Sequence, residues 1–306
     1  MSNSPSSRPR VAFQGEHGAF SEAAAIQLLG ENITTVPRAT FNSAFRAIAE
    51  GAADALLAPV ENSLAGSVVR VYDLLLESNL SIVAETILPI EHHLIGCPGA
   101  TLSGLKSVSS HPMALAQCER FFLSHPELKR VPAEDTAGSV RDVLASGDKS
   151  AAGVAGRQAV IRYGGVILCE GIQDNSENFT RFVLLIPDKN NEPTLTVIRH
   201  ALTEAEGPQP TPSSEDKKLK MSIALRLAHK PGALIAALEP FARHGINLMK
   251  IESRPIHGSP WVYQFFLDVE ASSPEKLDAA LSAVWPSTSF LRVLGFYSPA
   301  RSQSTI

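Results

Sequence analysis

A threonine and an arginine stand side by side at the start of an apolar run in the stretch ENFTRFVLLIP, residues 177–187. The unbroken apolar residues 182–186 predict a strand that is buried on both faces. A guanidinium beside a buried strand is energetically costly unless an anion pairs with it. We therefore expect Thr180 and Arg181 to meet an anionic group, with the hydroxyl of Thr180 beside it.

Hydroxyl-bearing and small residues also occur where predicted strands give way to helices. The N-terminus of a helix presents free N–H groups and a partial positive charge, which bind carboxylates or phosphates. One such turn is ordinary helix capping, but four of them in one α/β domain, together with Thr180 and Arg181, favour an anionic ligand. The four segments are QGEHGAFSE (14–22), APVENSLAGS (58–67), SSHPMALAQC (109–118) and EDTAG (134–138).

Several other kinds of active site lack their sequence patterns here. The segment GEHGAFSE does not match the GxGxxG loop of dinucleotide-binding proteins, and no Gly-x-Ser-x-Gly elbow occurs. Cys118 is expected in the middle of a helix without an obvious base, so nucleophilic catalysis is not indicated. The adjacent histidines of EHH (91–93) would point to opposite faces of a strand, which indicates a structural role rather than a metal site. We expect neither a metal nor a cofactor.

Composition narrows the class of protein further. Lys plus Arg number 27 and Asp plus Glu number 31, so there is no basic excess and we expect no nucleic-acid partner. Three cysteines without CxxC spacing are typical of a reducing compartment. No apolar run reaches transmembrane length, and the Ser- and Pro-rich N-terminus lacks the apolar segment of a signal peptide. We therefore expect a cytoplasmic protein with no membrane partner.

Predicted strands and helices alternate from Arg10 to Pro187. Ser21 is expected to cap a helix that Gly30 ends, and Thr136 to cap a later helix that Gly147 ends. Such alternation predicts an α/β fold with a largely parallel sheet and helices on both faces. The strands are expected at 10–15, 53–60, 81–97 with a break at Pro89, 166–172 and 182–186.

Composition changes after Pro187. The polar, Pro-rich residues 203–218 predict a linker. Beyond it the pattern predicts strand, helix, two strands, helix and strand, which is the ferredoxin-like βαββαβ order. The strands are expected at 220–228, 245–255, 261–270 and 289–297, and the helices at 231–244 and 274–285.

Several motifs in order now match a known family. QGEHGAFSEAA, APVENSLAGSV, SHPMALAQC, DTA and NFTRF closely resemble the motifs of prephenate dehydratase. KPGALIAAL, INLMKIESRP and WVYQFFLD resemble the phenylalanine-binding ACT domain that follows it in that family. Ala19 and His17 depart from the usual Thr and Pro, which could alter the pocket near the first helix. The linker also looks longer than usual.

The resemblance implies a domain organisation. A catalytic domain over 10–188 would have two α/β lobes with a cleft between them, like a bacterial solute-binding protein. A linker and the ACT domain would follow, with short tails at both ends. The expected bounds are a disordered tail 1–9, one lobe of about 10–90 with 179–188, a second lobe 91–178, a linker 189–218, the ACT domain 219–298 and a tail 299–306.

The resemblance also implies a reaction, the conversion of prephenate to phenylpyruvate with loss of CO2 and water. Thr180 would donate a hydrogen bond to the leaving hydroxyl, Arg181 would hold a carboxylate or organise the site, and Glu134 would be the ultimate proton source. The implied substrate-binding residues are Asn62, Ser63, Ser110, Gln117, Thr136 and Phe182.

Feedback control by L-phenylalanine is implied for the C-terminal region, with pairing of ACT domains into a homodimer or homotetramer. Gly232 stands at a predicted helix start, where free N–H groups can meet the carboxylate of an amino acid. The implied effector-binding residues are Gly232, Ala233, Leu234, Asn247, Glu252, Ser253, Arg254 and Pro255.

Two alternatives stay open. An arogenate dehydratase would share the motifs and act on the amino form of the substrate. A catalytically silent amino-acid sensor would have the same domains, but it would not need a donor for a leaving hydroxyl, so the intact TRF and ENS motifs argue against it.

Overall fold

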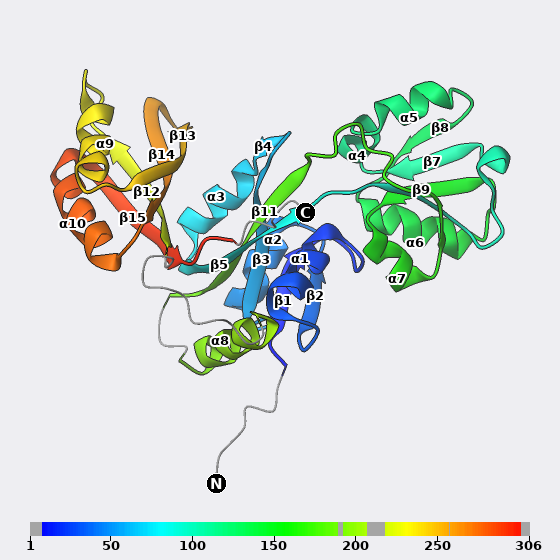
Figure 1. The fold of residues 1–306 in the computed structure, drawn as a ribbon, viewed down its shortest axis with the longest axis horizontal. Coiled ribbons are helices and arrows are strands. Elements are labelled where there is room, and N and C mark those ends of the chain that lie inside the picture. The colour runs from blue at the N-terminus through cyan, green and yellow to red at the C-terminus, as the bar shows by residue number, and fades with distance from the viewer. Residues whose placement is uncertain (1–7, 189–191, 207–217, 257, 301–306) are drawn as a thin grey trace, which may run out of the picture. The chain divides into compact units, whose positions relative to one another are not determined.

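A computed structural model describes residues 8–188, 192–206, 218–256 and 258–300 (Figure 1). These residues divide into two compact units, which are described separately. Among the described residues, the first unit comprises 8–78, 86–183 and 192–205, and the second comprises 79–85, 184–188, 206, 218–256 and 258–300. The expected domain bounds therefore do not coincide with the units, because parts of two strands expected in the catalytic domain belong to the second unit.

The first unit contains two sheets. One is built on β1 (Arg10–Gln14), which pairs in parallel with both β2 (Thr34–Arg38) and β3 (Ala55–Asn62). The strand order in this region is β5-β11-β3-β1-β2, with β5 at Leu80–Pro89 and β11 at Phe179–Pro187. The short β4 (Gly66–Ser67) returns antiparallel to the end of β3. The helices of this region are α1 (Phe20–Leu29), α2 (Phe41–Ala49) and α3 (Val69–Glu77).

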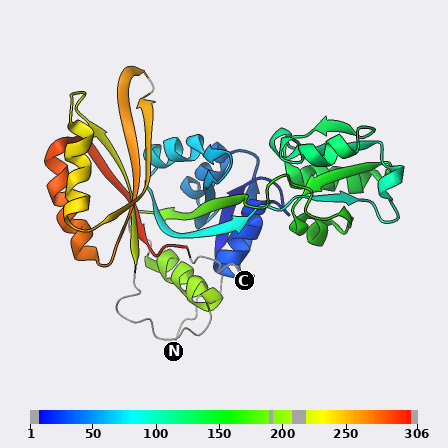
Figure 2. The same ribbon diagram turned by 45° about the horizontal axis from the view of Figure 1, so that its top comes forward.

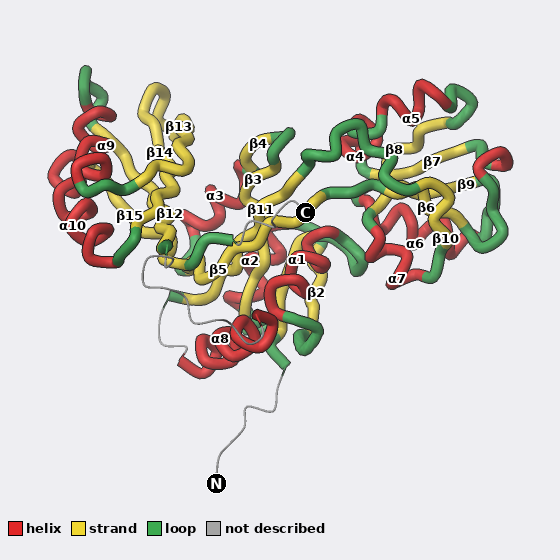
Figure 3. The backbone as a smooth tube through the Cα atoms, viewed as in Figure 1, coloured by secondary structure: helices red, strands yellow, loops and turns green. Residues whose placement is uncertain are grey.

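The second sheet of this unit uses only residues from the interval expected for the second lobe, 91–178 (Figure 3). Its strand order is β10-β6-β9-β7-β8; β9 is parallel to β7 and antiparallel to β6. The strands are β6 (His93–Gly96), β7 (Ser107–Ser110), β8 (Lys129–Pro132), β9 (Ala151–Ala155) and β10 (Val166–Cys169). The helices are α4 (Pro112–Ala116), α5 (Glu119–Ser124), α6 (Thr136–Ser146), α7 (Arg157–Tyr163) and a short 3-10 helix, Leu102–Gly104.

Alternate residues of β6 and β9 face opposite sides of this sheet, as strand geometry requires. Leu94 and Val154 pack with the side chains of α4 and α5. Ile95 and Ala155 pack on the other face with α6 and α7, in a cluster that also includes Phe13 and Ala19 from the first sheet region. The two sheet regions of the first unit thus share one apolar cluster.

A close backbone approach holds the GEHG segment against α7. Gly18 has φ +83°, and a Cβ added there would lie 2.9 Å from Cα of Ala159. The hydroxyl of Tyr163 donates a hydrogen bond to the carbonyl oxygen of His17 at 2.7 Å. Only glycine meets both demands at position 18, namely a positive φ and the absence of a side chain.

The interval expected as a linker, 189–218, contains a helix, α8 (Glu192–Glu206). Ile198 and Ala201 are buried, which explains why part of this segment orders on the first unit. The sequence predicted no helix here because the Pro-rich composition of 203–218 indicated a linker. Residues 189–191 and 207–217 of that interval lie outside the described residues, as do 1–7 of the N-terminal tail and 301–306 of the C-terminal tail.

The second unit contains the expected βαββαβ arrangement (Figure 2). Its strands are β12 (Leu219–Leu227), β13 (Asn247–Ile256), β14 (Ser259–Ala271) and β15 (Thr288–Tyr297), in the antiparallel order β13-β14-β12-β15. Its helices α9 (Ala233–Arg243) and α10 (Pro274–Val284) pack their apolar side chains into one core with the sheet, and a 3-10 turn follows at Trp285–Ser287. The expected fold class, α/β with a C-terminal ferredoxin-like domain, is confirmed.

Two expected helix caps are wrong. Ser21 lies inside α1, whose N-cap is Ala19, although Gly30 does end the helix. Asp135 rather than Thr136 caps α6, because its carboxylate accepts the N–H of Gly138. Asp is an equally good capping residue, and the sequence EDT offers both.

Cys118 does not lie in the middle of a helix. It is the N-cap position between α4 and α5, where it is fully buried. Burial raises the pKa of its thiol to about 12. The thiol is therefore protonated and unreactive at neutral pH.

Candidate active site

Thr180 is the second residue of β11 and is 9% exposed. Its Oγ1 accepts a hydrogen bond from Nδ2 of Asn62, at the end of the neighbouring strand β3, at 2.9 Å. The ends of two adjacent strands therefore bring Thr180 and Asn62 together across 118 residues of sequence. This contact joins two motifs, ENS and TRF, that the sequence singled out separately.

Backbone groups fix the orientation of the Asn62 amide. Its Oδ1 accepts the N–H of Leu64 at 3.0 Å and the N–H of Ala65 at 2.8 Å, in a turn of the kind that Asn favours. Its Nδ2 must then face Thr180 Oγ1 and Asn178 Oδ1, which lie 2.9 and 2.7 Å away.

The direction of this hydrogen bond decides what Thr180 can do. A hydroxyl has one proton and two acceptor lone pairs. Because Asn62 donates to one lone pair of Thr180, the hydroxyl proton of Thr180 remains available to another acceptor. The site therefore presents a hydrogen-bond donor, which is what a departing hydroxyl group needs.

The polar chain continues from Asn62 into the second sheet region. Asn178, only 1% exposed, directs its Nδ2 to Oε1 of Gln117 at 3.3 Å. The same oxygen lies 2.9 Å from Nε2 of His92. Gln117 ends α4 and His92 immediately precedes β6, so this chain connects the two sheet regions of the first unit.

Ser63, which follows β3, forms hydrogen bonds with the backbone at the start of β11. Its hydroxyl donates to the carbonyl oxygen of Glu177 at 2.8 Å and accepts the N–H of Phe179 at 2.9 Å. Its own N–H donates to the carbonyl oxygen of Phe179. The hydroxyl proton of Ser63 is thus engaged by the backbone, and the residue positions the strand that carries Thr180.

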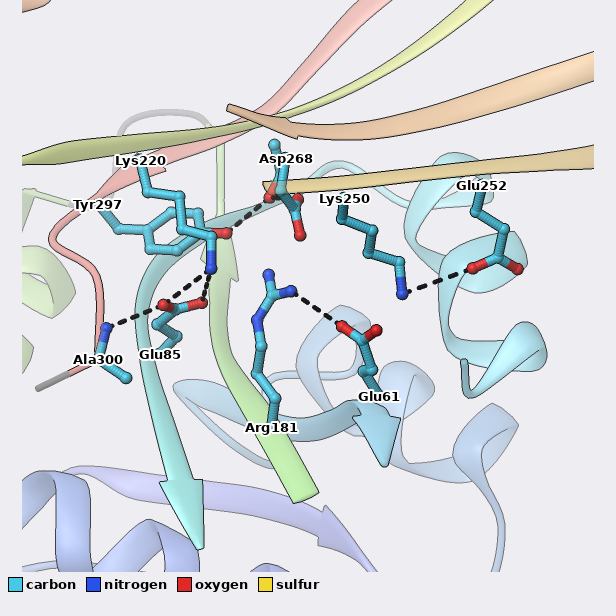
Figure 4. A network of polar contacts seen from close by, with 10 residues as sticks. Glu61, Glu85, Arg181, Lys220, Lys250, Glu252, Asp268, Tyr297 and Ala300 are labelled. Carbon is cyan, nitrogen blue, oxygen red and sulfur yellow. Dashed lines mark hydrogen bonds and ion pairs between the residues drawn. The ribbon is translucent and has the colours of Figure 1, made fainter. Parts of the chain in front are cut away.

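Arg181 does not face the same side of β11 as Thr180. Successive side chains of a strand point to opposite faces, and Nη1 of Arg181 lies 3.4 Å from Oε2 of Glu61, the residue before Asn62. Figure 4 shows this ion pair. The structure therefore does not bring Arg181 to the Thr180 hydroxyl, and the anion that the sequence led us to expect beside the guanidinium includes a carboxylate of the protein itself.

Four other predicted residues make no side-chain hydrogen bond to Asn62 or Thr180 in the part of the chain that the structure describes. Ser110 is fully buried and donates to the carbonyl oxygen of Val154 at 2.6 Å, so its proton is also engaged. Phe182 is 2% exposed and belongs to the core. Thr136 is the first residue of α6, and Glu134, two residues earlier, is exposed.

Two residues of the polar chain, Asn178 and His92, were not predicted as site residues from the sequence. Asn178 belongs to the NFTRF motif, and a buried amide two residues before Thr180 could have been inferred from strand alternation, since both side chains face the same side. His92 was assigned a structural role. Both His92 and His93 are 2% exposed, so the exposure of these adjacent histidines does not distinguish them.

The effector-binding residues expected in the second unit occupy neighbouring elements of one small domain. Gly232 caps α9 with φ +80°, Ala233 is buried, and Leu234 is partly buried. Asn247 begins β13, and Glu252 lies 3.5 Å from Lys250 on the same strand (Figure 4). Ser253, Arg254 and Pro255 follow on β13.

Within the described residues, no group of three or more histidine, cysteine, aspartate or glutamate side chains could hold a metal ion. No helix in that part of the chain is long and apolar enough to cross a membrane.

The fold and the site define an α/β protein with a buried hydroxyl donor at adjoining strand ends and a C-terminal βαββαβ domain. Residues 11–190 match the prephenate dehydratase family, and residues 221–285 match the ACT domain family. The chain belongs to the prephenate dehydratase family.

Relatives from plants and bacteria are similar over nearly the whole chain. Arogenate dehydratase/prephenate dehydratase 1, chloroplastic, of Arabidopsis thaliana is 37% identical, over 97% of this chain and 74% of the relative. The bifunctional chorismate mutase/prephenate dehydratase of Aquifex aeolicus (strain VF5) is 35% identical, over 96% of this chain and 75% of the relative.

Two solved structures are similar at the level of the fold and the sequence. Prephenate dehydratase from Arthrobacter aurescens, in complex with L-Phe, superposes with a TM-score of 0.79 at 30% identity, over 97% of this chain and 92% of that one. GqqA, described as a novel type of quorum quenching acylase, gives a TM-score of 0.79 at 32% identity, over 96% of this chain and 98% of that one.

Proposed function

We propose that the protein is a prephenate dehydratase that forms phenylpyruvate, CO2 and water in the biosynthesis of L-phenylalanine. The observation that carries the proposal is the hydrogen bond from Asn62 to Thr180, which leaves the proton of a buried hydroxyl free for the substrate. Membership of the prephenate dehydratase family supports the choice of substrate class.

The reaction balances without a cofactor. The ring carboxylate of prephenate leaves as CO2, and its bonding electrons move into the ring. The C–O bond on the opposite side of the ring breaks, and the hydroxyl departs with that electron pair and gains one proton to become water. Aromatisation of the ring supplies the driving force, so the barrier lies in the departure of the hydroxyl group.

Thr180 lowers this barrier by hydrogen-bond donation. A threonine hydroxyl is too weak an acid to lose its proton outright, so it stabilises the charge that develops on the departing oxygen. Help of this kind is worth about 10²–10⁴ in rate. Glu134, an exposed carboxyl group, is the proposed ultimate source of the proton that completes the water.

Gln117 is proposed to contact the substrate, whose two carboxylates need N–H donors. Asn62, whose N–H groups donate to Asn178 and Thr180, is proposed to hold Thr180 beside the substrate. We place Ser63 and Ser110 as residues that shape the site, since both hydroxyl protons are engaged by backbone oxygens. Arg181 is proposed to hold the start of β11 against the end of β3 through its ion pair with Glu61. Phe182 supports β11 from the core, and Thr136 supports the start of α6.

The direct test is to incubate the purified protein with prephenate and, separately, with arogenate. Formation of phenylpyruvate from prephenate is the expected result. Both compounds are tested because the relatives are named for arogenate, for prephenate or for both. If the protein forms phenylalanine from arogenate and does not convert prephenate, arogenate is its substrate. Conversion of neither compound by the folded protein would overturn the proposal.

An acylase is a less favoured function, although one similar structure bears that description. Acyl transfer commonly needs an activated nucleophile. The pKa of the Cys118 thiol is raised to about 12, and the hydroxyl protons of Ser63 and Ser110 are engaged by carbonyl oxygens. Hydrolysis of an acyl amide without any dehydratase activity would be the result in favour of this function.

Feedback regulation by L-phenylalanine through residues 219–298 is the second part of the proposal. It is supported by the match to the ACT domain family and by the complex of the Arthrobacter enzyme with L-Phe. We propose that residues 232–234, 247 and 252–255 bind the effector where two ACT domains pair, in a homodimer or homotetramer. Titration of the active, full-length protein with phenylalanine should lower turnover and raise the melting temperature.

We also propose a cytoplasmic location. The three cysteines are free, which is typical of proteins in a reducing compartment. Several plant relatives are named chloroplastic, so the location of the family varies.

A further inference from the structure

His92 is a buried histidine with an unusual set of partners. Its backbone is fixed on both sides, because its N–H donates to Oε1 of Gln173 and its carbonyl oxygen accepts the N–H of Ile172. Its Nε2 lies 2.9 Å from Oε1 of Gln117, and its Nδ1 is buried without a hydrogen-bond partner among the described residues. The ring of Phe20 packs edge-on against it.

The hydrogen-bond directions along the polar chain determine the state of this ring. The backbone of residues 64 and 65 orients Asn62, so Nδ2 of Asn62 donates to Asn178. Nδ2 of Asn178 must then donate to Oε1 of Gln117. Because Oε1 of Gln117 can only accept, Nε2 of His92 must donate to it as well. His92 is therefore the tautomer with its proton on Nε2.

The same directions fix the carboxamide of Gln117. Its oxygen accepts from both Asn178 and His92, so its NH2 group must point away from them. Gln117 is half-buried, and this NH2 group donates no hydrogen bond to the described part of the chain. Two N–H donors are therefore available beside the residues that hold Thr180.

We propose that His92 is a positioning residue that holds the Gln117 carboxamide with its NH2 group directed to a carboxylate of the substrate. This inference rests on the proposed dehydratase function, in which the substrate carries two carboxylates. His92 itself touches neither the substrate nor the departing hydroxyl. Its effect passes through Gln117. Without the N–H of His92, only the longer contact from Asn178, at 3.3 Å, would oppose a half-turn of the carboxamide that presents an oxygen to the anion.

A purely structural role explains His92 less well. A buried polar atom without a partner costs free energy that an apolar side chain of similar size would avoid. Burial also lowers the pKa of His92, so the ring is neutral and offers a single N–H. This N–H donates to Gln117, and the hydrogen bond offsets part of the free-energy cost of burying the ring.

The test compares two substitutions at position 92 in the full-length protein. His92→Leu removes the N–H donor, whereas His92→Gln places an amide N–H near the position of Nε2. We expect His92→Leu to raise KM for prephenate by about tenfold or more, the equivalent of one lost hydrogen bond to a charged group, with a smaller effect on kcat. His92→Gln should recover most of this loss.

A double-mutant cycle with Gln117→Ala separates positioning from general destabilisation. If His92 acts through Gln117, the variant Gln117→Ala should be about as impaired as the combination of His92→Leu and Gln117→Ala. His93→Leu is a matched control, because His93 is equally buried but bonds to the N–H of Gly171 instead. It should leave KM for prephenate close to that of the unmodified protein.

Losses that multiply in the double variant would overturn the inference, as would equal effects of His92→Leu and His93→Leu on KM. Absence of recovery in a folded His92→Gln protein would count against it too. Each of these results is obtained on an active parent enzyme. Failure of the proposed function would instead be seen as absence of turnover in the unmodified protein, so the two failures are distinguishable.

Discussion

The hydroxyl proton of Thr180 is the group on which the proposed chemistry depends, and its availability is set by one neighbour. Asn62 donates to Thr180 Oγ1 because backbone N–H groups hold the oxygen of its amide on the other side. Replacement of this amide by a carboxylate of the same shape would keep the turn and reverse the contact. Thr180 would then donate its proton to the protein rather than to the substrate.

We therefore predict that Asn62→Asp lowers kcat by about 10²-fold or more, on the scale of general acid assistance, while the protein stays folded. Steady-state kinetics with circular dichroism checks both parts. Asn42→Asp is the matched control, because Asn42 is exposed and its oxygen already accepts from Arg70, so a carboxylate suits that position. A folded Asn62→Asp protein with unchanged kcat would contradict the assigned direction of the hydrogen bond.

The sequence named Thr180, Arg181, Asn62 and Gln117 as candidate site residues but did not predict which of them lie in contact. Adjacent residues on a strand face opposite sides, and this rule, applied to TRF, already separates Arg181 from Thr180. The same rule pairs Glu61 with Arg181 and Asn62 with Thr180, once β3 and β11 are known to be neighbours. That adjacency is a tertiary fact, and neither segment alone contains it.

At the level of single elements, the turn before α1 is organised by a buried carboxylate. Glu22 accepts the N–H of Gly18 at 2.6 Å, the hydroxyl of Thr35 at 2.6 Å and a contact from His17 Nδ1 at 2.7 Å. Burial alone would raise the pKa of Glu22, but these hydrogen bonds outweigh it and hold the pKa below its usual value. The GEHG segment, first considered as a nucleotide loop, is thus shaped by its own glutamate.

This arrangement predicts a pH-dependent contribution to stability. A carboxyl whose pKa is lower in the folded state stabilises the fold above its unfolded pKa, and the contribution is lost as pH falls through the folded pKa. Glu22→Gln should therefore lower the free energy of unfolding at pH 7 by about 1.5–3 kcal/mol, the range for hydrogen bonds to a charged group. The difference from the unmodified protein should shrink in the acid range.

Urea unfolding at pH 7 and at increasingly acidic pH measures this difference. Glu31→Gln, at an exposed position, is the control for a general change of net charge. A stability loss in Glu22→Gln that is the same at every pH would show that the carboxylate charge is not involved.

The helices and strands themselves were predicted unevenly. The strands and helices of the βαββαβ domain were found within a few residues, because each combines a clear apolar pattern with turn residues at its ends. β2 and α2 were not assigned, and α8 was taken for linker. Tertiary packing orders β2 and α8. By contrast, α2 has a clear local signal that was overlooked, a capping box of Thr40 and Ser43 before residues that are buried on one face.

At the level of the whole molecule, the second compact unit does not begin at the family boundary. Besides the βαββαβ domain it includes residues 79–85, with the first part of β5, and residues 184–188, with the last part of β11. Within it, Nζ of Lys220 lies 3.0 Å from both carboxylate oxygens of Glu85, and the N–H of Ala300 donates to the same carboxylate (Figure 4). Gly295 lies so close to Ile82 that an added Cβ would meet the carbonyl oxygen of Ile82 at 2.1 Å.

A cut in the chain before residue 218 would therefore be a poor test of regulation. It would leave Glu85, whose side chain is 2% exposed in the whole protein, without Lys220. Phenylalanine sensitivity is better measured on the full chain. The family matches cover residues 11–190 and 221–285, whereas the contacts of the second unit also involve this segment of β5.

The buried Lys220–Glu85 pair gives a prediction of its own. Removal of one partner of a buried ion pair costs about 3–5 kcal/mol, because the other charge stays buried, whereas replacement of both by apolar residues is often neutral. We expect Lys220→Met to lower the free energy of unfolding strongly and Lys220→Met with Glu85→Leu to recover most of the loss. Denaturant unfolding of the three proteins measures both effects.

Lys218→Met is the matched control, because Lys218 also pairs with a carboxylate, Glu270, but is exposed. Its replacement should change stability little, as is usual for surface ion pairs. Equal stability of Lys220→Met and Lys218→Met would contradict the account of the buried pair.

The proposed dehydration of prephenate with the hydroxyl of Thr180 as donor is tested most directly by a matched pair of variants. Thr180→Val keeps the shape of the side chain but removes the hydroxyl, and Thr180→Ser keeps the hydroxyl. The measurement is phenylpyruvate formation under saturating prephenate, on proteins shown to be folded. We predict that Thr180→Val lowers kcat by about 10²–10⁴ and that Thr180→Ser retains much of the activity. A folded Thr180→Val protein that turns prephenate over at the rate of the unmodified protein would contradict the account.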